Sequence, residues 1–308
     1  MTTTRPDPTT LSSEPRTSVL RAARGHLPPG AQRVIRGGAL RYGVATAPLR
    51  MLPDFLVVGA QRCGTTTLYR LLAEHPAIVK PLFHKGIGYF DLSYDRSWNW
   101  YRGHFPIASL AERRTRGTGA PMTFDSSGYY LYHPLGATRI ARSMPDVKVV
   151  ALVRDPVDRA HSAHKHEQAR GFEDLPFEAA VELEAARIAG EADRMRADPS
   201  YQSFEHRHHS YLARGRYAEQ IVAFQQALTP QQVFVIDANR FFAEPVEQFA
   251  RLQEWLGLPA YRPRHVAQEN ARPRAPMPDS LRRRLLEYFE GPDAELTAIL
   301  GTEPSWRA

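Results

Sequence analysis

The sequence predicts an α/β fold of three layers, in which a central parallel sheet is flanked by helices. Apolar runs at residues 55–58 and 147–153 have the length and composition of buried strands. A helical pattern follows each run, and a third run at residues 233–238 lies between two more helical patterns. Strand–helix alternation of this kind is typical of a parallel sheet covered on both faces.

The length of 308 residues suits one α/β domain with appendages. We expect this domain at residues 51–308, after a disordered or basic leader at residues 1–50. Residues 1–15 are rich in Thr, Pro and Ser, a composition typical of disorder. No stretch approaches the roughly 20 apolar residues of a membrane span, and the N-terminus has no apolar signal segment.

Residues 16–50 contain seven arginines and no acidic residue. One interpretation is a basic segment that makes weak contact with an anionic membrane surface. The other is a solvated leader, partly docked on the domain. We favour the second because Pro28, Pro29 and several glycines interrupt any long helix.

The net charge of +7 favours an anionic partner: a nucleotide, a sulfated or phosphorylated ligand, a lipid head group or a nucleic acid. No recognition motif supports nucleic acid, so we expect no such partner. Cys63 is the only cysteine. This excludes an internal disulfide and a cysteine-based zinc site, and it fits a cytoplasmic protein.

The first strand leads into GAQRCGTT at residues 59–66, which has the glycine spacing of a phosphate-binding P-loop before a helix. Backbone N–H groups at such a helix start bind anions. However, Thr65 stands where an ATP-binding loop needs its lysine. Arg154 precedes Asp155 at the strand end where a magnesium ligand is expected. Both features count against a P-loop kinase that uses ATP and magnesium.

This P-loop-like region resembles the sulfotransferases that use 3′-phosphoadenosine 5′-phosphosulfate (PAPS). The resemblance implies that consecutive residues hold the 5′-phosphosulfate: Arg62, Cys63, Gly64, Thr65, Thr66 and Thr67. Many members of this family carry a lysine at the position of Arg62. An arginine keeps the charge and forks onto a phosphate or sulfate, but it is not an equivalent proton donor.

A second motif, LVRDPVDRAHSAH at residues 152–164, resembles the 3′-phosphate site of the same family. The resemblance assigns Arg154 and Ser162 to that phosphate. Arg154 leaves a strand at its carboxyl end, where ligands of open parallel sheets bind. Ser162 lies two turns along a helix that begins with Asp155 as N-cap and Pro156 as first residue. Arg159 has two interpretations, a ligand contact or an ion pair with Asp155.

The resemblance continues over most of residues 54–308, and the C-terminal part is similar to bacterial and heparan-sulfate-type members. In the latter, a basic loop near the C-terminus closes over the nucleotide. The resemblance therefore implies that Arg272 and Arg274 contact its phosphates; the alternative is a solvated arginine pair.

Sulfuryl transfer needs positively charged side chains beside the leaving phosphate and a base near the acceptor's proton. Arg62 and Lys85 are the candidates for the charge. In heparan-sulfate-type members a glutamate after the lysine is the base, but Gly86 stands at this position and Ser126 replaces a lysine frequent in relatives. His84, Asp91 and His104 are the substitutes in this loop, although a structural role is favoured for each.

We expect the acceptor over the loop at residues 80–105 and the helices at residues 165–215. Aromatic and basic residues of that loop suit a carbohydrate or glycolipid: Tyr89, Trp98, Trp100, Tyr101 and His104. The run HRHH at residues 206–209 invites a metal site, but adjacent residues of a helix cannot all face one ion. We interpret it as a solvated patch or part of the acceptor site, and we expect no metal.

The sequence thus predicts a PAPS-dependent sulfotransferase that acts on a hydroxyl or amine of an unidentified acceptor, such as a carbohydrate, glycolipid or other small metabolite. A non-catalytic protein that binds PAPS or its product remains the alternative, because Gly86 and Ser126 replace expected catalytic residues. A P-loop kinase is the third hypothesis.

Overall fold

The computed structural model describes residues 29–82, 85–263 and 277–308. Four parallel strands form one sheet in the order β2-β1-β3-β4. Their bounds are β1 Phe55–Gly59, β2 Phe124–Ser126, β3 Lys148–Val153 and β4 Val233–Asp237. The predicted central parallel sheet is therefore confirmed.

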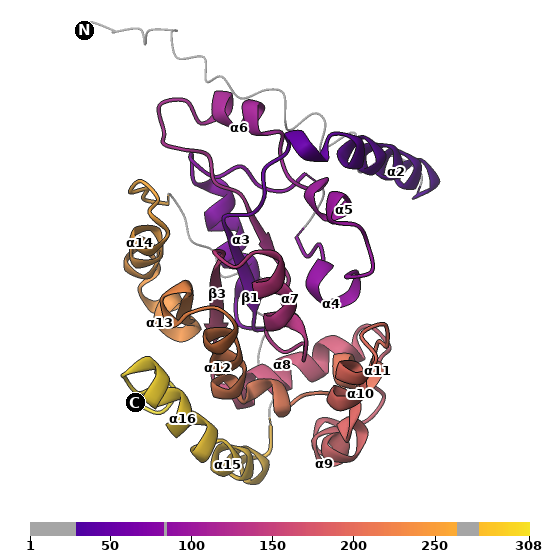
Figure 1. Ribbon diagram of the computed structural model, residues 1–308. Coiled ribbons are helices and arrows are strands. Elements are labelled where there is room, and N and C mark those ends of the chain that lie inside the picture. Colours follow the sequence, from indigo (N-terminus) through magenta and orange to yellow (C-terminus); the bar gives the residue numbers. More distant parts are fainter. Residues whose placement is uncertain (1–28, 83–84, 264–276) are drawn as a thin grey trace, which may run out of the picture.

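Helices surround this sheet (Figure 1). In chain order they are α2 Pro29–Ala45, α3 Thr65–Glu74, α4 Tyr89–Leu92, α5 Trp98–Arg102, α6 Ala108–Arg114, α7 Gly136–Ser143, α8 Pro156–Gln168, α9 Phe177–Ile188, α10 Glu191–Ala197, α11 Phe204–His208, α12 Tyr217–Ala227, α13 Ala238–Ala243, α14 Pro245–Leu256, α15 Asp279–Tyr288 and α16 Glu290–Leu300. Across the sheet, the step from β1 to β2 goes toward one edge. The steps from β2 to β3 and from β3 to β4 go toward the other edge. Right-handed crossovers consequently place α3 on one face of the sheet, and α7 and α12 on the other.

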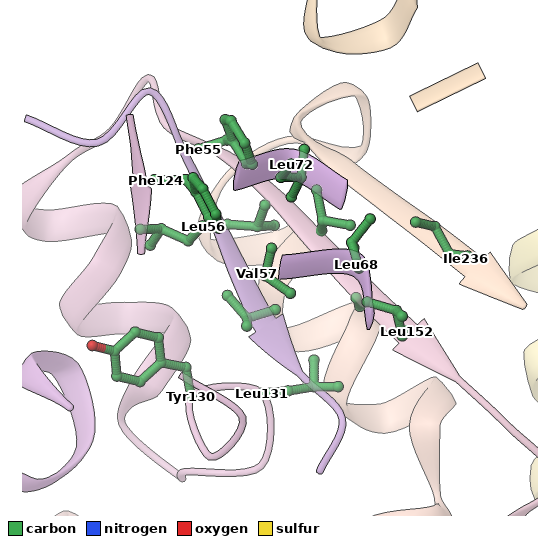
Figure 2. Packing of buried hydrophobic residues seen from close by; sticks show 14 of the residues in the cluster. Phe55, Leu56, Val57, Leu68, Leu72, Phe124, Tyr130, Leu131, Leu152 and Ile236 are labelled. Carbon is green, nitrogen blue, oxygen red and sulfur yellow. The ribbon is translucent and has the colours of Figure 1, made fainter. Parts of the chain in front are cut away.

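Part of the core lies between α3 and the sheet (Figure 2). Leu68 and Leu72 of α3 are fully buried, as are Val57 of β1 and Leu152 of β3. Burial of a side chain of this size contributes about 1.5–3 kcal/mol. Packing on this scale fixes the helix start, and with it the loop between β1 and α3.

Two strands differ from the sequence expectation. β2 was not predicted, because it has only three residues and two of them, Asp125 and Ser126, are polar. It pairs with β1 in a register that stacks the rings of Phe55 and Phe124 with centroids 5.2 Å apart. β4 was expected to be buried, but only Ile236 is buried, since β4 lies at the edge of the sheet.

Helix α2 corrects the expectation that prolines and glycines prevent a long helix before the domain. It spans 17 residues and begins at Pro29, a position where proline is tolerated. Gly43 allows close packing on α5, because a Cβ there would lie 2.5 Å from the carbonyl oxygen of Gly103. Arg50 then donates to the carbonyl oxygen of Phe105 at 2.5 Å. Packed structure therefore begins before Met51.

None of the helices in the part of the chain that the structure describes is long and apolar enough to span a bilayer. Within residues 16–50, the stretch 16–28 lies outside the described residues. Contact of this segment with a membrane surface therefore stays a prediction.

Helix α15, near the C-terminus, packs against α8. Arg282 of α15 donates to Asp155 at 3.0 Å and to Asp158 at 2.9 Å, while Asp155 also caps the N-terminus of α8. Leu281 and Leu285 of α15 join a second apolar cluster with Val157 of α8. Both contacts hold the helix that carries part of the predicted nucleotide site.

Candidate functional site

The loop between β1 and α3 has the backbone shape of an anion cradle. Gly64 lies in the left-handed region at φ 88°. It is the N-cap of α3, whose first residue is Thr65. Arg62 also has a positive φ of 72°. The first N–H groups of an α-helix have no partner within the helix, so the start of this ten-residue helix is suited to bind an anion.

Two cations contact hydroxyl groups at this loop. Lys85 donates from Nζ to Oγ1 of Thr65 at 2.8 Å and of Thr66 at 3.1 Å. Burial lowers the pKa of Lys85 to about 8. Arg62 donates from Nε to Oγ of Ser162 at 3.0 Å. The predicted 5′-phosphosulfate loop is thus in direct contact with α8.

Arg154 lies at the carboxyl end of β3, beside this loop. Its guanidinium donates to the carbonyl oxygen of Arg62 at 3.4 Å and pairs with Asp158 at 3.7 Å. The side chain is 24% exposed, so it remains accessible to a ligand. The structure therefore brings together the two motifs, Arg62–Thr67 and Arg154–Ser162, that are far apart in the sequence.

A cleft of about 480 Å³ opens beside the loop. Its walls come from the loop, the segment after α3, the turn after β2, α8 and α11: Gln61, Arg62, Thr65, Thr66, Lys85, Gly86, Gly88, Asp91, Leu92, Ser127, Gly128, Tyr129, His166, Glu167, Arg170, Arg207, His208 and Arg214. A second hollow of about 480 Å³ lies at the opposite edge of the sheet, where β1 and β3 begin. Ligands of open parallel sheets bind at the carboxyl ends of strands, which favours the first cleft.

Comparison with known proteins shows to which family the chain belongs. The model of the sulfotransferase domain matches residues 52–273. The chain belongs to the sulfotransferase domain family.

Relatives of this chain include the human bifunctional heparan sulfate N-deacetylase/N-sulfotransferase 3, which is 29% identical over 216 residues. That match covers 68% of the chain but 23% of the relative. The Caenorhabditis elegans bifunctional heparan sulfate N-deacetylase/N-sulfotransferase 1 is 23% identical over 83% of the chain and 31% of its own length. The chain thus spans less than a third of each of these relatives.

A solved sulfotransferase from Alicyclobacillus acidocaldarius has the same fold. It superimposes with a TM-score of 0.60 at 28% identity, over 84% of this chain and 100% of the other. The predicted resemblance to PAPS-dependent sulfotransferases is therefore confirmed at the level of the family and of the fold.

The chain departs from the family expectation at two positions in or near the cleft. Gly86 lines the cleft at φ 81°, and it offers no side chain where a glutamate base was expected. Ser126 is buried, and its hydroxyl has no hydrogen-bond partner among the described residues. Neither residue supplies a base to the cleft.

Asp91 is the expected substitute base that the structure places in the cleft wall. Its Oδ1 accepts the backbone N–H of Leu92 at 2.6 Å. Burial, opposed by this hydrogen bond, raises the pKa of Asp91 to about 6. His84, Arg272 and Arg274 lie outside the described residues, so their roles stay predictions.

The aromatic side chains expected to line the acceptor site pack against one another instead. Tyr89 stacks on Tyr101 with ring centroids 4.6 Å apart, and both are buried. Trp98 packs on the same pair. His104 is also buried, and its Nδ1 lies 2.8 Å from the carbonyl oxygen of Trp100. None of these four lines the cleft.

The run at residues 206–209 is not a solvated patch, since His206, His208 and His209 are buried. Arg207 and His208 line the cleft, as the acceptor-site interpretation expected. Within the described part of the chain, no group of three His, Cys, Asp or Glu side chains is placed to hold a metal ion.

Several cleft residues were missed from the sequence. Arg214 donates to Oε1 of Gln61 and lies over the ring of Tyr129 at 4.8 Å. Glu167 of α8 and Arg170, two residues after the end of α8, also line the cleft. No helical spacing from Ser162 indicates Glu167, because a separation of five residues turns about 140° round the helix.

Arg159 does not line the cleft. It is fully buried and donates to the carbonyl oxygen of Tyr211. Its expected partner Asp155 instead bonds Arg282. The structure therefore supports a role for Arg159 in packing.

Proposed function

We propose that this sulfotransferase binds PAPS across its two motifs and transfers the sulfuryl group to an acceptor held in the cleft. The 5′-phosphosulfate lies on Arg62–Thr67 and the N-terminus of α3. The 3′-phosphate lies on Arg154 and Ser162. Arg272 and Arg274 complete the phosphate contacts from the C-terminal segment.

The observation that carries this proposal is the convergence of cations on one helix start. Lys85 reaches Thr65 and Thr66, while Arg62 bridges to Ser162 and Arg154 contacts the loop backbone. Three cations at the N-terminus of a helix fit a ligand with several anionic groups, because both the charges and the N–H dipoles attract anions.

The same cations suit the chemistry. In sulfuryl transfer, an acceptor oxygen or nitrogen attacks sulfur while the bond from sulfur to the 5′-phosphate oxygen breaks. Negative charge then develops on that oxygen. Lys85 and Arg62 stabilise it by electrostatics.

The acceptor is a molecule with a hydroxyl or amine group that fits beside the loop. The relatives that act as heparan sulfate N-sulfotransferases support a carbohydrate. The cleft beyond the loop offers a ring at Tyr129 and hydrogen-bonding charge at Arg170 and Arg207, which suits a polar acceptor. The second candidate is a non-catalytic nucleotide-binding protein, which Gly86 and Ser126 favour.

Calorimetric titration with 3′-phosphoadenosine 5′-phosphate (PAP), 5′-AMP and ATP–magnesium tests the nucleotide assignment without an acceptor. We expect PAP to bind at least about tenfold more tightly than 5′-AMP, because each charge-assisted phosphate contact is worth about 1.5–3 kcal/mol. Preference for ATP–magnesium overturns the proposal in favour of a kinase. Binding of PAP without turnover of PAPS with any acceptor favours the non-catalytic candidate.

A further inference from the structure

A carboxylate–histidine pair lies in the wall of the cleft, at residues that we do not assign to the nucleotide. Nδ1 of His208, at the end of α11, is 2.8 Å from Oε2 of Glu167 on α8. Both residues line the cleft, and both are almost completely buried, with 7% and 2% of their surfaces exposed. The pair is built into the fold rather than formed by two surface side chains.

The imidazole of His208 is held in one orientation. The rings of Phe172 and Phe204 pack against it with centroids 4.5 Å and 4.6 Å away. The carboxylate on Nδ1 favours the tautomer in which Nδ1 carries the proton. Nε2 then has a lone pair, and it makes no hydrogen bond with any residue that the structure describes.

Glu167 is suited to hold this tautomer. Burial raises its pKa, but the hydrogen bond with His208 and the charge of Arg170 are among the causes that oppose burial, and the pKa lies below its ordinary value. Arg170 is 3.6 Å from the same Oε2. Glu167 is therefore an anion at neutral pH, so it stabilises a proton that arrives on the imidazole.

We propose that His208, oriented by Glu167, is the general base of this sulfotransferase, in the role that Gly86 cannot fill. The inference rests on the proposed transfer from PAPS. The acceptor oxygen or nitrogen forms its bond to sulfur as its proton passes to Nε2 of His208. The bond from sulfur to the 5′-phosphate oxygen breaks, its electron pair stays on PAP, and the imidazolium later releases the proton to water.

Asp91 is the competing base, since it lines the same cleft. Its carboxylate is occupied differently: Oδ1 accepts the Leu92 N–H at the start of the short helix α4. No second group orients Asp91 toward an acceptor in the way that Glu167 orients His208. The geometry therefore favours the pair.

The test compares His208→Ala with His209→Ala. His209 is a matched control because it is equally buried and also bonds a carboxylate, Glu205, but it does not line the cleft. PAP affinity is measured first by calorimetry. PAP formation from PAPS is then followed with three probes as acceptor: N-unsubstituted heparosan oligosaccharide, p-nitrophenol and water.

We expect His208→Ala to lower kcat by about 10²–10⁴-fold, with PAP affinity within about twofold of the unmodified protein. His209→Ala should lower the stability of the protein, but its kcat should fall by less than about tenfold. Added imidazole should restore part of the activity of His208→Ala, which a purely structural role would not allow. If His208→Ala fails to fold, His208→Gln keeps the side-chain volume and a donor for Glu167, and the same loss is expected.

Glu167 is a positioning residue, and a pH profile tests it. Glu167→Gln keeps the hydrogen bond but removes the anion, so the acid limb of kcat/KM should move to lower pH. The other titratable or charged groups that face His208 across the cleft are unchanged in this variant: Arg62, Lys85, Asp91, Tyr129, His166, Arg170, Arg207 and Arg214.

Failure of the two proposals is distinguishable. If the unmodified protein does not bind PAP, the proposed function is wrong. If it binds PAP but His208→Ala keeps full kcat, or Asp91→Asn loses more kcat than His208→Ala, the assignment of the base is wrong and the nucleotide site stands. PAP binding without PAPS turnover for all three probes also overturns the base.

Discussion

Nζ of Lys85 lies 2.8 Å from Oγ1 of Thr65, the first residue of α3. This bond ties the segment after α3 back to the phosphate loop. Thr65 stands where an ordinary P-loop has the lysine that directly follows its second glycine. A cation from 20 residues further along the chain therefore contacts that position.

Lys85 should therefore control the rate at high pH. Its pKa is lowered to about 8 by burial, and only the protonated form carries the charge that stabilises the leaving phosphate. We expect kcat to fall as pH rises through about 8, and Lys85→Ala to lower kcat by about 10²–10³-fold at pH 7.

The matched variant is Lys85→Arg, which keeps a cation at every accessible pH. It should retain more activity than Lys85→Ala and lose the basic limb of the pH profile. An unchanged basic limb in Lys85→Arg would assign that limb to another group.

Arg154 should govern recognition of the 3′-phosphate. Arg154→Ala removes one charge-assisted contact, so PAP affinity should fall by about 10–100-fold while 5′-AMP affinity stays within about twofold. Arg113→Ala, an exposed arginine at the end of α6, controls for the loss of net charge. Equal losses for both nucleotides, measured by calorimetry, would contradict the assignment of Arg154.

The meeting of Arg62 with Ser162 was predictable from the sequence. Each residue follows a strand of strong apolar character, and the carboxyl ends of neighbouring parallel strands meet at one edge of the sheet. The N-cap at Asp155 and the helix after Pro156 were also correct. Here local signals and sheet topology agree, which is why the contact between the two motifs could be predicted.

The part of the cleft around His208 was not predictable in the same way. The pairing of His208 with Glu167 depends on how α11 packs on α8, and no periodicity in the sequence specifies this packing. The aromatic loop was misjudged for a related reason. Composition shows that Tyr89 and Tyr101 are aromatic, but only the tertiary structure shows that they stack on one another in the core.

Asp91 should affect stability in a pH-dependent manner. Its pKa is raised from 3.8 to about 6 in the folded protein, so the folded state binds a proton more tightly than the unfolded state. The free energy of unfolding should consequently fall as pH rises from about 4 to about 6. The shift of about two units corresponds to roughly 3 kcal/mol at most.

Asp91→Asn removes this titration while keeping the side-chain shape. In urea unfolding, we expect the variant to match the unmodified protein near pH 4 and to exceed it by about 1–3 kcal/mol at pH 7. A constant difference between the two proteins from pH 4 to pH 7 would show that burial does not penalise the Asp91 anion.

Gly64 should be required both for the loop conformation and for space. Its φ of 88° is strained for any residue with a Cβ, and a Cβ there would lie 2.8 Å from the ring of Phe242.

Gly117→Ala is the matched control, since Gly117 has a φ of 86° but nothing within 4 Å of the added Cβ. Gly117→Ala should cost about 1–2 kcal/mol from backbone strain alone. We expect Gly64→Ala to cost more in thermal unfolding and to weaken PAP binding, which Gly117→Ala leaves intact. Equal losses of stability and unchanged PAP affinity in both variants would mean that the ring of Phe242 yields freely and that the loop tolerates a changed backbone.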